Sequence, residues 1–387
     1  MSIKRTVYNA DHEAFRLTFR EFLAKEVTPH FADWEADGRV PRELFHKLGA
    51  LGVMGFGIPE EYGGPGDPGY KYQAIISEET ARATVAIGHY GVTTTIVLPY
   101  LLRLANDEQR RRWLPGIATG DIVLCIAMTE PGTGSDLAGI RTTATMSPDG
   151  THYVLNGAKT FITGARNSEL CVVAARTSPP IDGNRRTGLS LLVVPTDSEG
   201  FVFGRKLDKI GMRSSDTNEL SFTDVRVPVT NLLGEEGRGF SYLGQNLPRE
   251  RLSIGADATA RAAAAIDVTR TYVRERYVFG QPVASFQNTK FVLAECETEV
   301  CAAQALVDKG IELDQAGELT AAVAARIKLY GTEVAGRVID KCLQLHGGYG
   351  YMLEYPIARL YADIRVNRIY GGTSEVMKTI IAKDMGL

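Results

Sequence analysis

The spacing of apolar residues changes twice along this chain of 387 residues. In the first 120 residues apolar side chains recur at helical spacing. Phe15, Phe19 and Phe22 are an example, on a segment that the sequence opens with Asp11. Residues 93–104 and 107–113 continue the helical pattern. We therefore predict an N-terminal α-helical domain over residues 1–120.

From residue 121 to residue 235 the apolar period approaches two, which is typical of strands. Candidate strands cover residues 123–128, 142–146, 152–155, 160–163, 170–175, 189–194 and 220–222. Asp149-Gly150 and Asn156-Gly157 predict hairpin turns, because both dipeptides tolerate the positive φ of a tight turn. Short strands at this spacing predict a middle β domain over residues 121–235, a compact barrel or sandwich.

After residue 235 the helical period returns. One apolar seam consists of Val323, Ile327, Tyr330, Val334, Val338 and Cys342. A second seam consists of Val292, Cys296, Val300 and Val307. Three or four long helices of this kind form a bundle, so we predict a C-terminal bundle domain over residues 236–387. The predicted fold class is thus α+β multidomain, with an N-terminal helical domain, a middle β-barrel domain and a C-terminal four-helix bundle.

Composition excludes several classes of function. A net charge of −3 leaves no polybasic region, so we expect no nucleic-acid partner. The five cysteines stand singly and the six histidines are scattered, so we expect no metal site. The first fifteen residues lack an apolar h-region, and no run of about 18 apolar residues occurs. We therefore expect a cytoplasmic protein with no membrane partner.

Residues 128–136 read MTEPGTGSD and form the most informative segment. Its glycines let a backbone approach a ligand closely, although by itself such a segment is equally a tight turn between strands. No GxGxxG motif opens a strand-turn-helix unit, so a Rossmann domain is not supported. Four further segments follow it in order: YVLNGAKTFIT at 153–163, RYVFG at 276–280, QLHGGYGY at 344–351 and YGGTSE at 370–375.

Together the five segments resemble the acyl-CoA dehydrogenase family of flavoenzymes, from about Phe15 to the C-terminus. The resemblance implies the same order of helical, β and helical domains, with FAD between the middle domain and the bundle. Positions that line or hydrogen-bond the flavin are matched by Met128, Thr129, Ser135, Phe161 and Thr163. Without the resemblance, Phe161 would be interpreted as a hairpin residue that faces the barrel interior. Gly164 stands where the family commonly has asparagine.

Arg276 presents a problem of distance. If residues 250–277 form one helix, the 26 steps from Glu250 to Arg276 span about 39 Å. A flavin near Glu250 then does not reach Arg276 of the same subunit, although paired N–H donors suit a pyrophosphate. Taken alone, Arg276 would be a solvated charge at a helix end.

The resemblance implies that one group of residues reaches the FAD of a neighbouring subunit. Its members are Arg276, Phe279, Gln287, Gln344, Gly347 and Gly348. We therefore expect a homo-oligomer, by resemblance a dimer of dimers, with each FAD shared across a dimer interface.

The catalytic base is expected at an unusual position. Many family members place the basic carboxylate in a Tyr-Glu-Gly-Thr motif, and this chain has Tyr370-Gly371-Gly372-Thr373 there. A subset that includes the long-chain and isovaleryl-CoA dehydrogenases supplies it from a Glu-Arg-Leu motif, which residues 250–252 match. The C-terminal segments also look most like the long-chain type. Taken alone, Glu250-Arg251 would be interpreted as charge compensation at a helix start.

The resemblance thus implies that Glu250 takes the α proton, with the Gly371 backbone N–H polarising the thioester carbonyl. Residues expected beside the substrate are Ser135, Arg251 and Tyr370. Residues expected near the cofactor are Thr373 and Glu375.

The leading functional hypothesis is FAD-dependent α,β-dehydrogenation of an acyl-CoA to the trans-2-enoyl-CoA, with an electron-transfer flavoprotein as acceptor. Three alternatives stay open on the same scaffold. They are a dehydrogenase of acyl groups tethered to a carrier protein, a flavin oxidase or monooxygenase, and a non-catalytic flavin-binding protein. The sequence does not predict the length or branching of the acyl group.

Overall fold

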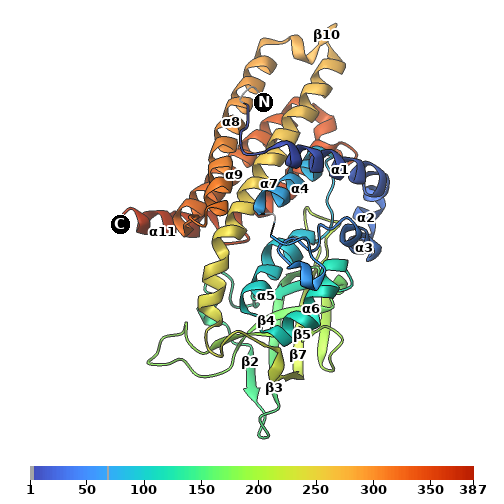
Figure 1. Ribbon diagram of the computed structural model, residues 1–387. Coiled ribbons are helices and arrows are strands. Elements are labelled where there is room, and N and C mark those ends of the chain that lie inside the picture. Colours follow the sequence, from blue (N-terminus) through green and yellow to red (C-terminus); the bar gives the residue numbers. More distant parts are fainter. Residues whose placement is uncertain (1–3, 68) are drawn as a thin grey trace.

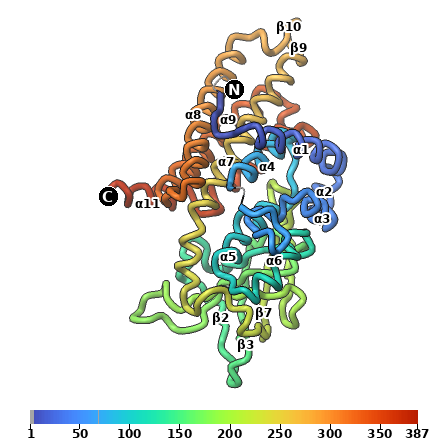
Figure 2. The backbone as a smooth tube through the Cα atoms, in the orientation of Figure 1, coloured from blue at the N-terminus to red at the C-terminus, as the bar shows by residue number. Residues whose placement is uncertain are grey.

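A computed structural model describes residues 4–67 and 69–387 of the chain. Helices dominate both ends of the sequence, and a sheet lies between them (Figure 1). The helical, sheet and helical zones follow one another along the chain, and the backbone trace shows the sheet at the end opposite the β9–β10 hairpin (Figure 2). Among the described residues, no helix has the length and apolar character that crossing a membrane requires.

The N-terminal zone consists of short helices packed around an apolar core. They are α1 (Ala10–Glu26), α2 (Phe31–Asp37), α3 (Glu43–Ala50), α4 (Tyr70–Arg82), a π-helical segment (Val92–Val97), α5 (Leu98–Leu104) and α6 (Asp107–Thr119). Phe19 is fully buried in this core, as its helical spacing predicted. The start of α1 differs from the prediction. Asn9 rather than Asp11 caps it, because the Asn9 side chain accepts a hydrogen bond from the His12 N–H.

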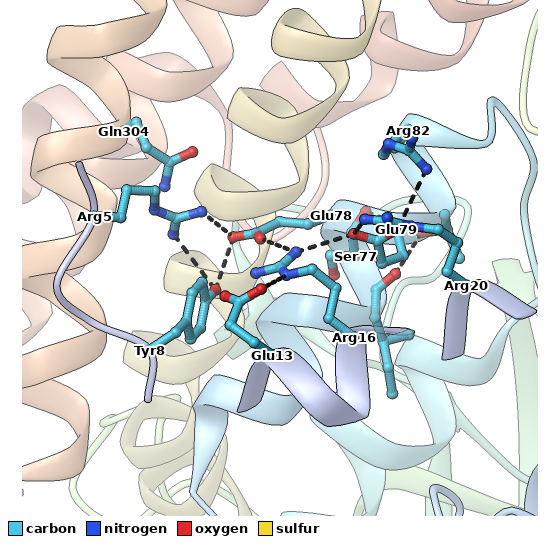
Figure 3. Close-up of polar contacts among 12 residues, drawn as sticks. Arg5, Tyr8, Glu13, Arg16, Arg20, Ser77, Glu78, Glu79, Arg82 and Gln304 are labelled. Atoms are coloured by element: carbon cyan, nitrogen blue, oxygen red, sulfur yellow. Dashed lines mark hydrogen bonds and ion pairs between the residues drawn. The ribbon is translucent and has the colours of Figure 1, made fainter. Parts of the chain in front are cut away.

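Charged side chains join the segment before α1 to α4 (Figure 3), and a further ion pair joins this segment to the C-terminal bundle. Arg5 donates to Glu78 of α4 at 2.7 Å and to Asp308 of the bundle at 2.9 Å. Glu78 and Glu79 of α4 also accept hydrogen bonds from Arg16 of α1. The segment before α1 is thereby fixed across two domains.

The middle zone is an eight-stranded sheet. Its strands are β1 (Leu124–Ala127), β2 (Thr143–Met146), β3 (His152–Thr163), β4 (Leu170–Arg176), β5 (Leu189–Pro195), β6 (Phe201–Lys206), β7 (Thr217–Pro228) and β8 (Leu232–Leu233). The hydrogen-bonded order is β6-β7-β3-β2-β4-β5-β8, and β1 pairs in parallel with β4. Side chains from β1 to β7 meet in one buried cluster on one face, and α5 and α6 cover the other face.

One of the two predicted hairpin turns is wrong. Asp149-Gly150 does lie in the turn between β2 and β3. Asn156-Gly157, however, lies within a continuous β3, where the pairing with β7 shifts between Leu155 and Gly157. A methyl group on Gly157 would lie 2.5 Å from Oγ1 of Thr142, so the glycine is required by the close approach of the residue just before β2 at a bulge.

The C-terminal zone is built on three long helices that lie side by side, α7 (Gly239–Glu275), α8 (Gln287–Gln315) and α9 (Ala321–Leu345). Shorter elements complete it: β9 (Tyr277–Val278), β10 (Gln281–Pro282), α10 (Pro356–Ile364) and α11 (Ser374–Asp384). The predicted seam on α9 is buried at Ile327, Val334, Val338 and Cys342. Tyr330 is 39% exposed and does not belong to it.

Helix α7 connects the two ends of the molecule, from the sheet to the β9–β10 hairpin (Figure 1). Helix α4 packs on α7. We propose to divide the chain after residues 120 and 235, which fall between α6 and β1 and between β8 and α7.

Candidate active site

Glu250 lies in the interior of α7. The helix begins at Gly239 and continues through Pro248, so Glu250 is three turns from the helix start. The field of a helix terminus falls off within the first turn, so Glu250 does not compensate the dipole of α7. The alternative interpretation of the Glu-Arg pair is therefore wrong.

The Glu250 carboxylate is buried and incompletely hydrogen bonded. The residue is 6% exposed, and its Oε2 atom has no hydrogen-bond partner among the described residues. Burial raises the pKa of Glu250 to about 7, although the charges of Arg251 and Lys328 oppose the shift. A carboxylate with an unpaired oxygen and a pKa near neutrality is suited to accept a proton.

Gly371 faces this carboxylate from the loop before α11. A methyl group placed on Gly371 would lie 3.4 Å from Oε1 of Glu250 and 2.5 Å from Cδ1 of Ile254. Gly371 and Gly372 have φ of 63° and 98°, which only glycine adopts readily. None of the hydrogen bonds of the described residues engages the Gly371 N–H. This N–H is therefore available to a bound ligand.

Two buried cationic side chains hold the Gly371 loop through hydrogen bonds to its carbonyl groups. Nε of Arg251 donates to the Gly371 carbonyl at 3.2 Å, and Nζ of Lys328 on α9 donates to the carbonyls of Asn367 and Gly372 at 3.0 and 2.7 Å. Arg251, which we expect beside the substrate, thus also supports the loop that carries the Gly371 N–H. The sequence did not single out Lys328. The signal for it was a lysine beside Ile327 in the buried seam of α9.

Tyr370 and the π-helical segment border the same region. The Tyr370 hydroxyl donates to Oδ1 of Asn367 at 2.8 Å. The negative charge of Glu250 adds to the burial that raises the pKa of Tyr100 on α5, so this hydroxyl also lies near the carboxylate. Asn246, one turn before Glu250, donates to the Ile96 carbonyl at 2.9 Å. Such π-helical turns occur often at functional sites. This one contains three consecutive threonines, Thr93 to Thr95, in a segment whose pattern predicted an ordinary helix.

A second cluster lies at the ends of β1 and β3. The Thr160 N–H donates to the Thr129 carbonyl at 2.9 Å, so the MTEPGTGSD segment and the end of β3 are adjacent. Nζ of Lys159, which is 1% exposed, donates to the Met128 carbonyl at 3.1 Å and to Oε1 of Glu130 at 2.9 Å. Glu130 in turn accepts the N–H groups of residues 141 and 142. Lys159 and Glu130 thus fix the glycine loop, whose Ser135 is exposed.

Phe161 points outward in a strained conformation. Its φ is 60°, it lies at a second bulge of β3, and it is 67% exposed. The interpretation that it faces the barrel interior is therefore wrong. Thr163 follows on the same strand, half-buried. A methyl group on Gly164 would lie 2.1 Å from the His89 ring, which explains a glycine there. An exposed aromatic ring on a strained backbone favours a ligand contact.

A third group lies at the far end of α7, away from the sheet (Figure 1). Arg276 follows the last residue of α7, and its guanidinium lies 5.3 Å from the ring centroid of Tyr349. Phe279 is 94% exposed. The other predicted members are also exposed, namely Gln287, Gln344, Gly347 and Gly348. The structure brings this group together and separates it from Met128 and Phe161.

The last two predicted cofactor residues begin α11. Thr373 caps this helix, because its side chain accepts a hydrogen bond from the Val376 N–H at 3.4 Å. Glu375 is exposed in the first turn, and hydrogen bonds from its own backbone N–H and from Thr373 lower its pKa. The negative charge of Glu375 is favourable at a helix N-terminus.

Comparisons with known proteins cover nearly the whole chain. Three family models match it, for the N-terminal domain of acyl-CoA dehydrogenases at residues 9–121, the middle domain at 125–225 and the C-terminal domain at 237–386. The long-chain specific acyl-CoA dehydrogenase of Sus scrofa mitochondria is 43% identical over 381 residues, which are 98% of this chain and 88% of that protein.

Two solved structures illustrate the likeness in three dimensions. The acyl-CoA dehydrogenase of Geobacillus kaustophilus has a TM-score of 0.95 and 44% identity, over 99% of this chain and 100% of that one. The acyl-CoA dehydrogenase of Bacillus anthracis complexed with FAD has a TM-score of 0.90 and 31% identity, over 99% of this chain and 69% of that one.

Proposed function

The chain belongs to the acyl-CoA dehydrogenase family, and from this premise we propose that Glu250 is the base of its reaction. The reaction is the FAD-dependent α,β-dehydrogenation of an acyl-CoA thioester to the trans-2-enoyl-CoA. The observation that carries the assignment is the buried, unpaired Oε2 of Glu250 beside Gly371, where the motif of other members has glutamate.

The residues of this chain suit FAD. The loop that Lys159 and Glu130 hold supplies backbone and hydroxyl groups, and Phe161 supplies an exposed ring next to it. We propose Met128, Thr129, Ser135, Phe161 and Thr163 as its contacts from the middle domain. When bound, FAD supplies the acceptor for the β hydrogen, which leaves as a hydride.

The remaining chemistry belongs to the protein. The α C–H of a thioester is a weak acid, so negative charge that develops on the carbonyl oxygen must be stabilised. The free N–H of Gly371 is placed to donate to that oxygen, and Glu250 accepts the α proton. The Glu250 carboxylate is buried, and the exclusion of water around it strengthens these interactions.

We further propose that Arg276 and its neighbours serve the FAD of another subunit. Arg276 is separated from Glu250 by 26 residues, or about 39 Å of helix, because α7 runs unbroken to Glu275. An exposed guanidinium beside the ring of Tyr349, which follows Gly347 and Gly348 in the sequence, suits a pyrophosphate. The proposed assembly is a homo-oligomer, a dimer of dimers by resemblance to the family.

An electron-transfer flavoprotein is the proposed acceptor. A solved structure of the electron transferring flavoprotein of Acidaminococcus fermentans includes a chain similar to this one, with a TM-score of 0.92 and 31% identity. The comparisons do not favour the oxidase or carrier-protein alternatives.

The proposed function is tested by steady-state oxidation of acyl-CoAs of increasing chain length, with an artificial acceptor and with the electron-transfer flavoprotein. We expect enoyl-CoA to form with either acceptor, and slow reoxidation of reduced enzyme by air. Rapid reoxidation by air, or turnover of acyl-carrier protein alone, would replace this proposal with one of the two alternatives.

A further inference from the structure

We propose that Lys328 is a positioning residue for the dehydrogenation. It holds the Gly371 loop so that the Gly371 N–H faces the thioester carbonyl oxygen while the Glu250 carboxylate faces the adjacent α-carbon. This inference rests on the proposed function. Lys328 lies on α9, and its hydrogen bonds go to the carbonyls of Asn367 and Gly372. Neither of these residues is the proposed base or an expected cofactor residue.

The placement of the lysine is unusual. Lys328 is 1% exposed and lies within the helix whose seam forms the core of the bundle. Burying an ammonium group is costly unless acceptors surround it, and the acceptors here are two backbone carbonyls. Those carbonyls belong to Asn367 and Gly372, which lie on either side of Gly371 in the sequence. The cost of burial is thus offset by bonds that fix one loop.

That loop needs an external support. Gly371 and Gly372 both have positive φ, and glycine in such a segment has more freedom to lose than any other residue. Lys328 and Arg251 bind the carbonyls at 367, 371 and 372. These carbonyls are turned toward the two cations, and the Gly371 N–H has no acceptor among residues 4–67 and 69–387.

Lys328 also lies close to the base. A methyl group on Gly371 would lie 3.4 Å from Oε1 of Glu250 and 3.5 Å from Cε of Lys328. The positive charge of Lys328 lowers the pKa of Glu250 and opposes the effect of burial. The pKa of Lys328 is itself lowered to about 8 by burial and by Arg251. Charged and titratable groups that face this pair come from α5, α7, α9 and the loop, namely Tyr100, Arg251, Glu333 and Tyr370.

The test compares Lys328→Met and Lys328→Gln with Lys309→Met, a matched control on the exposed face of α8 where Lys309 is 63% exposed. Lys328→Met removes both the donors and the charge. We expect kcat to fall about 10²-fold, the loss typical of one misplaced oxyanion donor, with KM and FAD content nearly unchanged. The acid limb of the kcat profile should move to higher pH by about one unit, because a nearby cation is lost.

Lys328→Gln separates the two roles, since its amide can still donate to a carbonyl but carries no charge. It should recover much of kcat while keeping the shifted acid limb. It also keeps the test decisive if Lys328→Met does not fold. Lys309→Met should match the natural protein in both measurements.

A spectroscopic measurement reports the oxyanion contact directly. The probe is an acyl-CoA labelled with ¹³C at the thioester carbonyl. The Glu250→Gln variant should bind this substrate without turnover, and binding should lower the stretching frequency of the substrate's carbonyl group. In Glu250→Gln/Lys328→Met this lowering should be smaller.

Three results decide the proposal. A natural protein that oxidises no acyl-CoA would refute the proposed function itself. An active natural protein with unchanged kcat and acid limb in both Lys328 variants would overturn the positioning role alone. Lower thermal stability with unchanged kcat, acid limb and carbonyl frequency would also overturn it and make Lys328 a packing residue.

Discussion

The Glu250 carboxylate faces the α-carbon of Gly371, so that a methyl group on that glycine would lie 3.4 Å from Oε1. The two residues are 121 positions apart in the sequence, on α7 and on the loop before α11. Two carboxylates could not both ionise so close together without a large cost. A carboxylate at position 250 and a glycine at position 371 are therefore a complementary pair.

This relationship predicts that the base can be moved. Glu250→Gly/Gly371→Glu places the carboxylate on the loop, opposite the same substrate carbon, and should recover part of the activity that Glu250→Gly loses. Recovery should be limited, because a side chain at 371 meets Cδ1 of Ile254 at 2.5 Å and requires a positive φ. Adding Ile254→Val removes that methyl group and should raise kcat further. Equal inactivity of the single, double and triple variants in steady-state turnover would contradict a shared position.

The raised pKa of Glu250 predicts a pH dependence. Only the ionised carboxylate accepts a proton, so kcat/KM should rise with pH and level off above the pKa of about 7. A rate that is flat from pH 5 to pH 9 would show that another group removes the proton. The profile should be recorded with FAD content checked at each pH.

The raised pKa of Glu250 also predicts that the free energy of unfolding falls as the pH rises. The folded-state pKa of about 7 exceeds the ordinary value of 4.5, so the folded protein holds a proton that the unfolded chain has lost between these pH values. Below pH 4.5 the buried carboxyl group is neutral, and burying it costs no charge desolvation. Above pH 7 the buried group is charged, and this cost lowers the free energy of unfolding by at most about 3 kcal/mol. Glu250→Gln does not titrate. Its free energy of unfolding relative to the natural protein should therefore increase from pH 4.5 to pH 7, as measured by denaturant unfolding.

Arg276→Ala should weaken FAD retention rather than chemistry. The guanidinium is exposed and far from Glu250, so its loss removes a proposed cofactor contact without disturbing the base. The apparent Kd for FAD should rise, and activity at saturating FAD should stay close to that of the natural protein. Arg270→Ala is a matched control, because Arg270 is an exposed arginine near the end of α7, paired with Asp267. Equal FAD affinity in both variants would remove Arg276 from the cofactor site.

Lys159→Met should loosen the flavin loop. Lys159 and Glu130 form a buried ion pair, and removing one partner of such a pair typically costs about 3–5 kcal/mol. We expect a lower free energy of unfolding and weaker FAD binding together. Lys159→Met/Glu130→Gln leaves no unpaired buried charge and should restore stability more than FAD affinity. Unfolding curves and FAD titration measure both, and unchanged FAD affinity in Lys159→Met would separate the ion pair from the cofactor loop.

The order of domains was predictable because the period of apolar residues is a local property of the sequence. The spacing of Val334 and Val338 on α9, and the short, nearly continuous apolar runs of β4 and β5, are each visible within ten residues. What was missed depended on contacts between distant segments. Asn156-Gly157 has the chemistry of a turn, but the approach of Thr142 makes it a bulge. Tyr330 fits the seam by spacing but lies at its exposed edge.

The candidate site could be predicted only in part, for the same reason. Motif resemblance located Glu250 and Gly371, and the structure brings them together. Neither composition nor spacing indicates that Arg251 donates a hydrogen bond to the Gly371 carbonyl. The role of Lys328 is likewise set by carbonyls about 40 residues later in the chain. Such partners are fixed by the packing of α7, α9 and the loop before α11.

The most direct test of the assignment of Glu250 is the rate of flavin reduction by a good acyl-CoA substrate in Glu250→Gln, measured by stopped-flow absorbance. Glutamine keeps the volume of the side chain, but its amide does not accept a proton at neutral pH. We predict a rate reduced by at least about 10² to 10⁴-fold, with FAD content and substrate Kd nearly unchanged. Reduction at a rate close to that of the natural protein would contradict the assignment and leave the Glu-Arg-Leu motif a structural feature of α7.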